Sequence, residues 1–198
     1  HAAMVSTRGL LSSKMPPDKV PGLLRYLMKN RHGTPFEHAS LTFFVHAPLF
    51  VVREWQRHRM ASYNEESGRY KQLDPVFWEP RRTRPIEPVS DFKAARPEFA
   101  IGSDEMYDMI EQHDQILYAK AYAMYQREID AGISREVARR LLPLSIYSSF
   151  WVTMNPRSLM HFLALRTHHP EGLFTSYPQA EIEEAAVQVE NIFAEGWP

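Results

Sequence analysis

The sequence contains no cysteine among its 198 residues. This absence excludes disulfides, cysteine-based zinc sites and thiolate nucleophiles. The sequence also has no apolar run near the roughly 20 residues that cross a bilayer, so we expect a soluble, cytoplasmic protein with no membrane partner. The chain begins HAAMVS, with neither an initiator methionine nor a signal-peptide pattern, and we expect that its natural start is missing.

Several ligand-binding motifs are absent as well. The sequence has no G-x-G-x-x-G and no Walker A motif, so a bound nucleotide would not be held by a glycine-rich loop. No H-E-x-x-H occurs, and the adjacent His168 and His169 would point about 100° apart on a helix. We therefore predict no metal site.

Charge of one sign is not in excess. The chain has 23 basic and 24 acidic residues, for a net charge of −1, whereas a general nucleic-acid binder usually carries a basic excess. The positive charge is concentrated at Arg57–Arg59, Arg81–Arg84 and Arg139–Arg140. Because a guanidinium matches phosphate with a two-pronged fork, these clusters favour a small anionic ligand over a long polyanion.

The composition, 44% hydrophobic and 24% charged, is that of a globular protein. We predict one domain over residues 1–198, of mixed α and β structure with more helix than strand. Periodicity, prolines and capping residues place the helices at 20–29, 48–57, 103–131, 134–142, 155–166 and 179–194. Runs of β-branched and aromatic residues place strands at 37–47, 70–78 and 145–154, and 79–99 is predicted to be a surface connection.

The stretch RHRMASYNEESGRY, residues 57–70, has an unusual density of arginine, serine, glutamate and other hydrogen-bonding side chains. Cations at a helix end compensate the helix dipole, and a solvated polar loop would explain much of the remainder. Alternatively, Gly68 between Ser67 and Arg69 allows backbone N–H groups to converge on an anion, with Arg69 adding its fork. Composition leaves both interpretations open.

The order of these residues resembles the signature R-H-R-x-x-S-x-N-E-x-S-x-R-Y of the flavin-dependent thymidylate synthases. The resemblance extends to HGTPFEHASLTFFVHAP before the signature, and to REVARRLLPLSIY and NPRSLMHFLALR after it. It covers most of residues 31–166. It implies an α+β fold with a central, mostly antiparallel sheet flanked by long helices.

The resemblance also implies a reaction. The family converts dUMP to dTMP, with methylenetetrahydrofolate as carbon donor, FAD as hydride carrier and NADPH as reductant of the flavin. A homotetramer with shared active sites is expected. The absence of cysteine agrees with this reaction, because the flavin-dependent chemistry needs no thiolate on the enzyme.

The resemblance assigns roles to individual residues. Those that match cofactor-binding positions, for FAD, are Thr34, Arg57, His58, Arg59, Glu65, Asn155, Arg157 and His161. Those that match substrate-binding positions, for dUMP, are Glu54, Arg57, Glu65, Glu66, Ser67, Gly68, Arg69, Arg139 and Arg166. His32 matches a histidine that lies beside the flavin in the family and is linked to folate access.

Arg166 is the candidate catalytic side chain, because a guanidinium facing the uracil would favour the ionised base. Ser67 is expected to position phosphate, since a serine with no nearby base is a weak nucleophile. Asn155 and His161 have simpler explanations as a helix cap and a helix histidine. Glu54 stands where the family often has glutamine, which puts its substrate contact in doubt, and it is expected to pair with Arg57.

Two other functions compete with this hypothesis. One is an arginine-rich module that binds single-stranded nucleic acid, against which the neutral charge argues. The other is a flavin-dependent uracil methyltransferase that acts on a larger substrate. The compact loop at Ser67–Arg69 favours a free mononucleotide.

Overall fold

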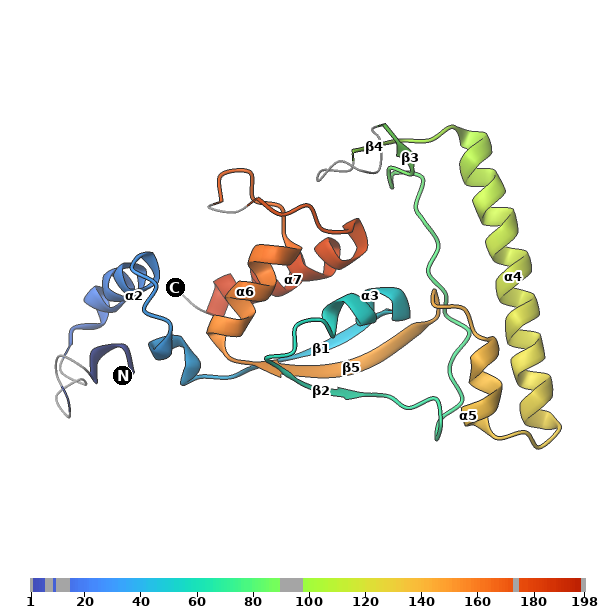
Figure 1. The fold of residues 1–198 in the computed structure, drawn as a ribbon, viewed down its shortest axis with the longest axis horizontal. Coiled ribbons are helices and arrows are strands. Elements are labelled where there is room, and N and C mark those ends of the chain that lie inside the picture. Colours follow the sequence, from blue (N-terminus) through green and yellow to red (C-terminus); the bar gives the residue numbers. More distant parts are fainter. Residues whose placement is uncertain (1, 6–8, 10–14, 90–97, 173–174, 197–198) are drawn as a thin grey trace. The chain divides into compact units, whose positions relative to one another are not determined.

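The structure is a computed structural model that describes residues 2–5, 9, 15–89, 98–172 and 175–196 (Figure 1). Its α-helices are α2 (Val20–Lys29), α3 (Leu49–Trp55), α4 (Asp104–Asp130), α5 (Arg135–Ala138), α6 (Pro156–Arg166) and α7 (Ala180–Gly196). Its strands are β1 (Leu41–Pro48), β2 (Ser62–Glu65), β3 (Glu87–Pro88), β4 (Phe99–Ala100) and β5 (Tyr147–Met154). Short 3-10 helices are η1 (Ala2–Met4), η3 (Pro17–Lys19), η4 (Thr34–Glu37) and η5 (Arg139–Leu141). This is the mixed α+β class that the sequence predicts.

The chain divides into two compact units. Unit 1 comprises 1–43, 58–63 and 151–198, and unit 2 comprises 44–57 and 64–150. The strands β1, β2 and β5 contribute residues to both, and each unit is described by itself below. The single domain expected from the sequence remains a prediction.

Three strands form one sheet in the order β1-β5-β2. Side-chain bonds join Thr42 to Thr153 and His46 to Ser149, both at 2.9 Å, so β1 and β5 run antiparallel. Along β5, alternate residues from Ser148 to Met154 are buried, which is the period-two pattern of a strand with one covered face. The antiparallel sheet is therefore confirmed, while β2, inside the signature, was not predicted.

In unit 2, a row of tyrosines on α4 binds the backbone of the segment that follows β2. The hydroxyl of Tyr122 donates to the Leu73 carbonyl at 3.0 Å, and that of Tyr125 accepts the Leu73 N–H at 3.2 Å. Tyr118 donates to the Trp78 carbonyl at 2.8 Å, and Tyr107 bonds the Arg84 carbonyl. Figure 1 shows this segment running alongside α4.

These bonds explain why the strand predicted at 70–78 is wrong. Only Phe77 pairs as an isolated bridge, with Ile146. The backbone groups of Leu73, which a strand would pair with a neighbouring strand, are bound by tyrosine hydroxyls instead. The segment therefore contacts α4 through Leu73, and only its end, at Val76–Trp78, bonds the chain around Ile146.

In unit 1, α6 packs against α7 and η4. The side chain of Asn155 accepts the N–H of Ser158 at 2.8 Å, and Pro156 occupies the first turn, so α6 begins as predicted. Apolar side chains from several elements form the core of this unit: Phe36, Phe43, Val152, Leu159, Phe162, Ile182 and Ala186.

Other boundaries also need correction. The strand predicted from residue 37 begins at Leu41, because η4 extends to Glu37. Pro48 ends β1 and is the N-cap of α3 instead of its first residue, since its backbone is extended. The helix predicted at 134–142 is split into α5 and η5, and Ser134 makes no side-chain cap bond.

The predictions for α2, α4 and α7 are confirmed to within two residues. Ser103 caps α4 through the Met106 N–H, and Gly132, with φ 85°, follows its end. Part of the connection predicted at 79–99, residues 90–97, lies outside the described residues. Among the described residues, no helix combines the length and apolar character that crossing a membrane requires.

Candidate active site

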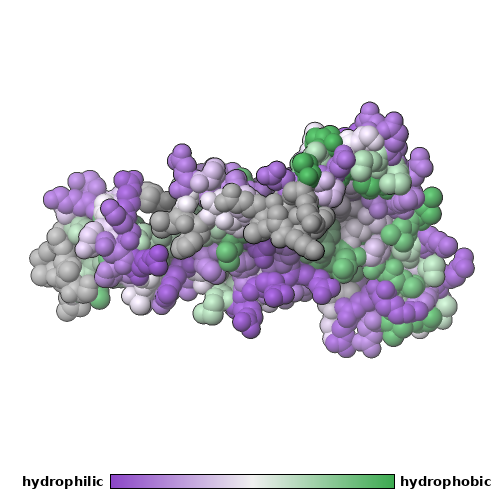
Figure 2. All heavy atoms as spheres, turned by 45° about the horizontal axis from the view of Figure 1, so that its top comes forward, coloured by the Kyte–Doolittle hydropathy of each residue, from purple (hydrophilic) through white to green (hydrophobic). Residues whose placement is uncertain are grey.

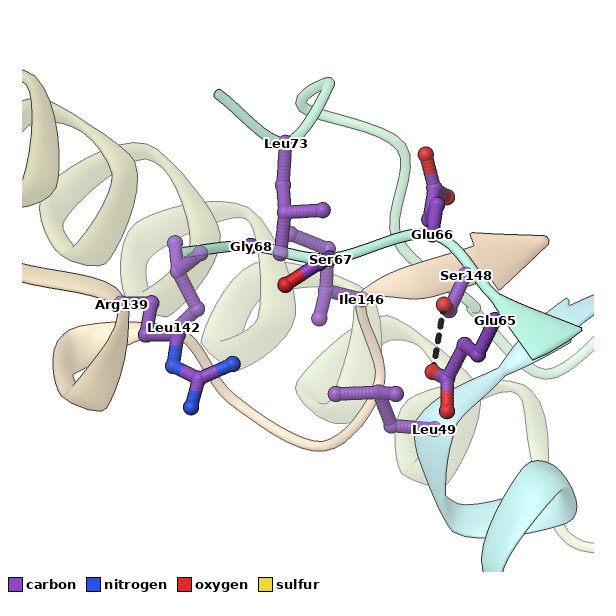
Figure 3. Close-up of a pocket in the computed structure, with 10 residues that line it drawn as sticks. All are labelled: Leu49, Glu65, Glu66, Ser67, Gly68, Leu73, Arg139, Leu142, Ile146 and Ser148. Atoms are coloured by element: carbon purple, nitrogen blue, oxygen red, sulfur yellow. Dashed lines mark hydrogen bonds between the residues drawn. The ribbon is translucent and has the colours of Figure 1, made fainter. Parts of the chain in front are cut away.

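Unit 2 contains a cavity of about 330 Å³ at the C-terminal end of the signature (Figure 3). Polar and apolar residues share its lining: Glu65, Glu66, Ser67, Gly68, Arg139, Ser148, Leu49, Leu73, Leu142 and Ile146. Five predicted substrate-binding residues are thus brought together by β2, the following loop and the start of η5. Figure 3 shows the Ser67 hydroxyl, the Arg139 guanidinium and the Glu65 carboxylate on the same side of the loop.

Glu65 is fixed in this lining by two hydrogen bonds. Its Oε1 accepts from the Ser148 hydroxyl at 2.6 Å, and its Oε2 accepts from Gln56 Nε2 at 3.2 Å. Ser148 is 3% exposed and lies between the buried residues Ile146 and Phe150. Sequence reasoning missed both partners, although a serine at an inward position of an alternating strand was a usable signal.

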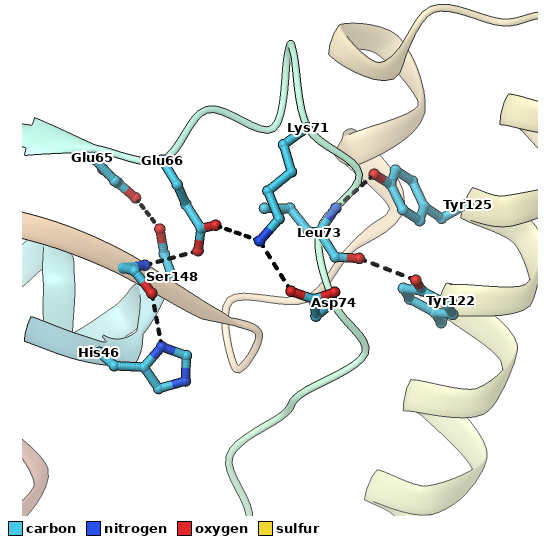
Figure 4. Close-up of polar contacts among 10 residues, drawn as sticks. His46, Glu65, Glu66, Lys71, Leu73, Asp74, Tyr122, Tyr125 and Ser148 are labelled. Carbon is cyan, nitrogen blue, oxygen red and sulfur yellow. Dashed lines mark hydrogen bonds and ion pairs between the residues drawn. The ribbon is translucent and has the colours of Figure 1, made fainter.

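Glu66 has both carboxylate oxygens engaged. Oε1 accepts the backbone N–H of Ser149 at 2.9 Å, and Oε2 accepts from Lys71 Nζ at 3.0 Å. Lys71 also bonds Asp74 at 3.0 Å (Figure 4). The predicted role of Glu66 in contacting substrate remains a prediction.

The loop after Glu66 is a closed turn. The Ser67 carbonyl accepts the N–H groups of Tyr70 and Lys71, both at 3.0 Å, and the Ser67 hydroxyl accepts the Arg69 N–H at 3.3 Å. Within the described part of the chain, the amides of Ser67 and Gly68 donate no hydrogen bond. Two adjacent amide donors are therefore left at the cavity.

Gly68 is buried, but its backbone does not have the positive φ that glycine uniquely favours. A Cβ at this position would lie 3.3 Å from both Arg139 Cδ and Leu73 Cδ1. A larger residue here would therefore require the Arg139 and Leu73 side chains to shift by a few tenths of an ångström, whereas the backbone conformation itself does not favour glycine.

The arginines of unit 2 differ in their partners. Arg140 forms a two-pronged pair with Glu128 at 2.6 and 2.8 Å, and Arg69 Nε bonds Glu136 at 2.9 Å. Within the described residues, the Arg139 side chain has no carboxylate partner, although it lines the cavity. An unpaired guanidinium beside unpaired amides is an arrangement that binds anions.

Unit 1 holds a second group of predicted site residues around His58. Arg166 Nε donates to His58 Nε2 at 3.1 Å, and the His58 ring contacts Phe162 edge-on, with centroids 4.9 Å apart. The ring of His161 lies 6.1 Å from that of His58. Burial, and then the charges of Arg166 and His161, lower the pKa of His58 to about 4, so His58 is neutral at physiological pH.

Arg157 and Thr34 lie at the contact of α6 with η4. Arg157 pairs with Glu37, and a Cβ on Gly33 would lie only 2.8 Å from the Arg157 guanidinium carbon. Thr34, the first residue of η4, directly follows this glycine and is exposed. Three predicted cofactor residues, Arg157, His161 and Asn155, are on or beside α6.

The remaining predicted residues lie outside the cavity lining. The Arg57 N–H donates to the Glu54 carbonyl at 3.3 Å, whereas the expected pairing of their side chains stays a prediction. Arg57, Arg59 and Arg69 are exposed, and the His32 N–H donates to the Leu27 carbonyl at 2.9 Å. Among the described residues, no group of three or more acidic or histidine side chains is placed to hold a metal ion.

The two groups define a class of protein. The first is an anion-binding cavity with apolar walls and a fixed carboxylate, and the second is a set of imidazole and guanidinium groups around a neutral histidine. Together with the mixed α+β fold, they are typical of an enzyme that acts on a small phosphorylated substrate with a polar cofactor.

Comparisons with known proteins identify the family. Residues 1–198 match the family model described as thymidylate synthase complementing protein. The flavin-dependent thymidylate synthase of Streptomyces coelicolor is 47% identical over 201 residues, covering all of this chain and 81% of that protein. The enzyme of the same name from Tropheryma whipplei is 49% identical over 172 residues, covering 87% and 71%.

A solved structure agrees with these relatives. The UMP/dUMP methylase PolB from Streptomyces cacaoi, bound with 5-Br dUMP, is 43% identical, with a TM-score of 0.88 over 98% of this chain and 83% of that one. The chain belongs to the family of flavin-dependent thymidylate synthases. Its membership confirms the predicted resemblance and favours an enzyme over a non-enzymatic nucleic-acid module.

Proposed function

We propose that this enzyme converts dUMP to dTMP, with methylenetetrahydrofolate as carbon donor and with FAD and NADPH supplying the reducing equivalents. The observation that carries the proposal is the cavity in which the Arg139 guanidinium lies beside the amides of Ser67 and Gly68. Among the described residues this guanidinium has no carboxylate partner and these amides donate no hydrogen bond. This donor set suits the phosphate of a mononucleotide. The names of the relatives support the same reaction.

Apolar and carboxylate groups of the cavity suit the remainder of the nucleotide. Leu49, Leu142 and Ile146 offer apolar contact to the base and sugar, and Glu65, held by Ser148, presents a fixed acceptor. A cavity of about 330 Å³ is at the small end of the range for ligand sites. It favours a free mononucleotide over a longer polymer.

The residues of unit 1 fit a flavin. The close approach of Arg157 to Gly33 makes a tight cationic corner that a side chain at residue 33 would fill, and the rings of His58 and His161 add polar edges. We assign FAD binding to Thr34, His58, Asn155, Arg157 and His161, with Arg57, Arg59 and Glu65 as further predicted contacts. When bound, the flavin supplies the hydride that the methyl transfer requires.

Arg166 is proposed as the residue that activates the uracil. Its Nε is held by His58, which keeps the guanidinium in one orientation. A fixed cation beside the base would stabilise negative charge as it develops on the ring. Since the chain has no cysteine, it has no thiolate with which to attack the ring instead.

We further propose a cytoplasmic homotetramer with shared active sites. Met109, Ile116, Leu117 and Met124 are between 44% and 67% exposed, and their spacing places them on one face of α4, opposite the tyrosine row. We call these four residues the outer face of α4. Figure 2 shows hydrophobic side chains exposed among polar ones over α4. A second copy of the chain would cover this face.

The direct test is a spectrum and a turnover assay. The purified protein should show the absorption of an oxidised flavin, or gain it on addition of FAD, and should form dTMP from dUMP only with methylenetetrahydrofolate and NADPH present. A protein that binds no FAD and forms no dTMP would contradict the proposal.

A second substrate is favoured by one specific observation. The Streptomyces cacaoi methylase was solved with 5-Br UMP as well as with 5-Br dUMP, and the UMP analogue complex is 42% identical to this chain with a TM-score of 0.88. We therefore include UMP as an alternative substrate. Competition between equal concentrations of UMP and dUMP, read out as the ratio of methylated products, decides between the two.

A further inference from the structure

Two oppositely charged side chains at the signature loop, Glu66 and Lys71, bond each other at 3.0 Å. We propose that Glu66 and Lys71 are a positioning pair: they hold the loop of Ser67–Tyr70 in its binding conformation, and Glu66 acts on the substrate only through that loop. The proposal rests on the proposed function in one respect, that this loop receives the nucleotide phosphate.

The first support is the double link between Glu66 and Ser149. The Glu66 N–H donates to the Ser149 carbonyl, and the Ser149 N–H donates to the Glu66 carboxylate, both at 2.9 Å. The side chain thus takes the acceptor position that a backbone carbonyl would occupy if β2 continued past Glu65. The chain can therefore turn away from β5 without leaving the Ser149 amide of that strand unpaired.

The second support is the difference between the two carboxylates that bind Lys71. Both lie 3.0 Å from Nζ, but the Glu66 side chain is 21% exposed and that of Asp74 is 72% exposed. An ion pair in contact with solvent on all sides contributes little, so the less exposed Glu66 is the effective partner. The pair closes the turn, because residues 66 and 71 flank the loop.

The third support is that the chain immediately after Lys71 is fixed as well. Leu73 is bound through its N–H by Tyr125 and through its carbonyl by Tyr122 (Figure 4). The turn is fixed at Ser149 on one side and at α4 on the other, with the Glu66–Lys71 bond between these points. The Ser67 and Gly68 amides are therefore ordered before a phosphate arrives, and binding loses less conformational entropy.

The engagement of Glu66 also argues against its direct contact with the substrate. Both oxygens of the Glu66 carboxylate are already bonded, one to Ser149 and one to Lys71. A carboxylate placed beside the nucleotide phosphate would also repel that phosphate. Figure 3 shows the Glu66 side chain leaving the loop on the side opposite to the Ser67 hydroxyl. Its effect on binding is then indirect.

The test is a double-mutant cycle with Glu66→Gln, Lys71→Met and the combined variant. Glutamine keeps an oxygen for the Ser149 N–H but turns an amide NH₂ toward Lys71, so it breaks only the ion pair. We expect each single variant to raise the KM for dUMP about fivefold, with a smaller change in kcat, and the double variant to be no worse than either single one. Asp74→Asn, which removes the exposed partner of the same lysine, is the matched control and should leave KM within twofold.

Backbone amide exchange of the ligand-free protein gives a readout that is independent of turnover. Exchange at residues 69–71, whose amides bond Ser67, should accelerate in Glu66→Gln and Lys71→Met, should not change in Asp74→Asn, and should be restored by Lys71→Arg. Unchanged exchange in both single variants, or additive effects on KM, would overturn the positioning pair. Failure of the proposed function itself would appear differently, as a parent protein that forms no dTMP although its loop exchange responds as expected.

Discussion

At the scale of single residues, the arginines of unit 2 are distinguished by what they contact. Arg139 and Arg140 are neighbours in η5, but Arg140 is bound by Glu128 while Arg139 faces the cavity. Arg140 therefore forms a structural pair, and we propose Arg139 as the arginine that binds the ligand.

We predict that Arg139→Gln raises the KM for dUMP by roughly 30-fold, because it removes a charged donor from the phosphate. Arg140→Gln is the control, and it should leave that KM unchanged. Isothermal calorimetry with dUMP, or steady-state kinetics, provides the measurement. Equal losses in the two variants would indicate a general charge effect and contradict the assignment.

A second prediction at the scale of single residues concerns His58. Its pKa is lowered to about 4 by burial and by the charges of Arg166 and His161. The unfolded chain protonates this ring near its ordinary pKa of 6.5, whereas the folded protein resists protonation down to about 4. Its contribution to stability is therefore complete above pH 6.5 and is lost as pH falls toward 4. We allow for solvent screening of a half-buried ring and expect a loss of about 1 to 2 kcal/mol.

This prediction is checked by urea unfolding at several pH values between 7 and 4 in the parent and in His58→Gln. The difference between the two isolates His58 from the other histidines, and it should shrink as the pH falls. An NMR titration should also show the pKa of His58 rising in Arg166→Gln, since one cause of its depression is removed. A His58 pKa near 6.5 in the parent would contradict the structure.

At the scale of secondary-structure elements, α4 acts on the signature loop through its tyrosines. We predict that Tyr125→Phe lowers the free energy of unfolding by about 1 to 3 kcal/mol, because the buried Leu73 N–H loses its partner. Tyr122→Phe should cost about 1 kcal/mol, since the Leu73 carbonyl is its principal acceptor. Denaturant unfolding measures both.

The exposed Tyr26 of α2 is the control for the same chemical change, and Tyr26→Phe should alter the free energy of unfolding by less than about 0.5 kcal/mol. If all three variants behaved alike, the tyrosine row would have no special role in fixing the loop.

Asn155, at the start of α6, has two proposed roles that one substitution can separate. Its side chain caps the helix, and it is also a predicted FAD contact. Serine keeps a capping oxygen, so Asn155→Ser should hold the free energy of unfolding within about 0.5 kcal/mol of the parent. We predict that it nevertheless weakens FAD binding several-fold in a fluorescence titration. Unchanged FAD affinity would leave capping as the only role of Asn155.

At the scale of the whole molecule, the signature is distributed between the two units. Arg57 and Asn64–Tyr70 belong to unit 2, whereas His58–Tyr63 belong to unit 1. Of the residues that resemblance assigns to FAD, all but Arg57 and Glu65 fall in unit 1, and most of those assigned to dUMP fall in unit 2. One short motif thus supplies residues to both functional groups.

The proposed homotetramer is a prediction at this scale. Replacing Ile116 and Leu117 on the outer face of α4 by glutamate should lower the mass measured by sedimentation and reduce turnover, if active sites are shared. Ala119→Glu, at an exposed position of α4 outside the outer face, is the control for added negative charge. A double variant that keeps the parent mass would show that this face is not the contact between copies.

Local signals in the sequence determined much of the fold. Helix caps and fixed backbone angles affect only the few residues next to them in the sequence. The ends of α4 and α6 were therefore predictable from Ser103 and Gly132 and from Asn155 and Pro156. The signature likewise determined the family, because the order of its side chains is itself the information.

Only the tertiary structure decided what those side chains contact. The partners of Glu65 and Glu66 on β5 are 83 residues away, and Leu73 is bound by tyrosines about 50 residues away. A hydroxyl from α4 can satisfy the same backbone groups as a neighbouring strand, so the pattern at residues 70–78 could not distinguish the two. The physical reason is that a hydrogen-bond donor needs an acceptor within about 3 Å, and folding alone determines which distant segment provides it.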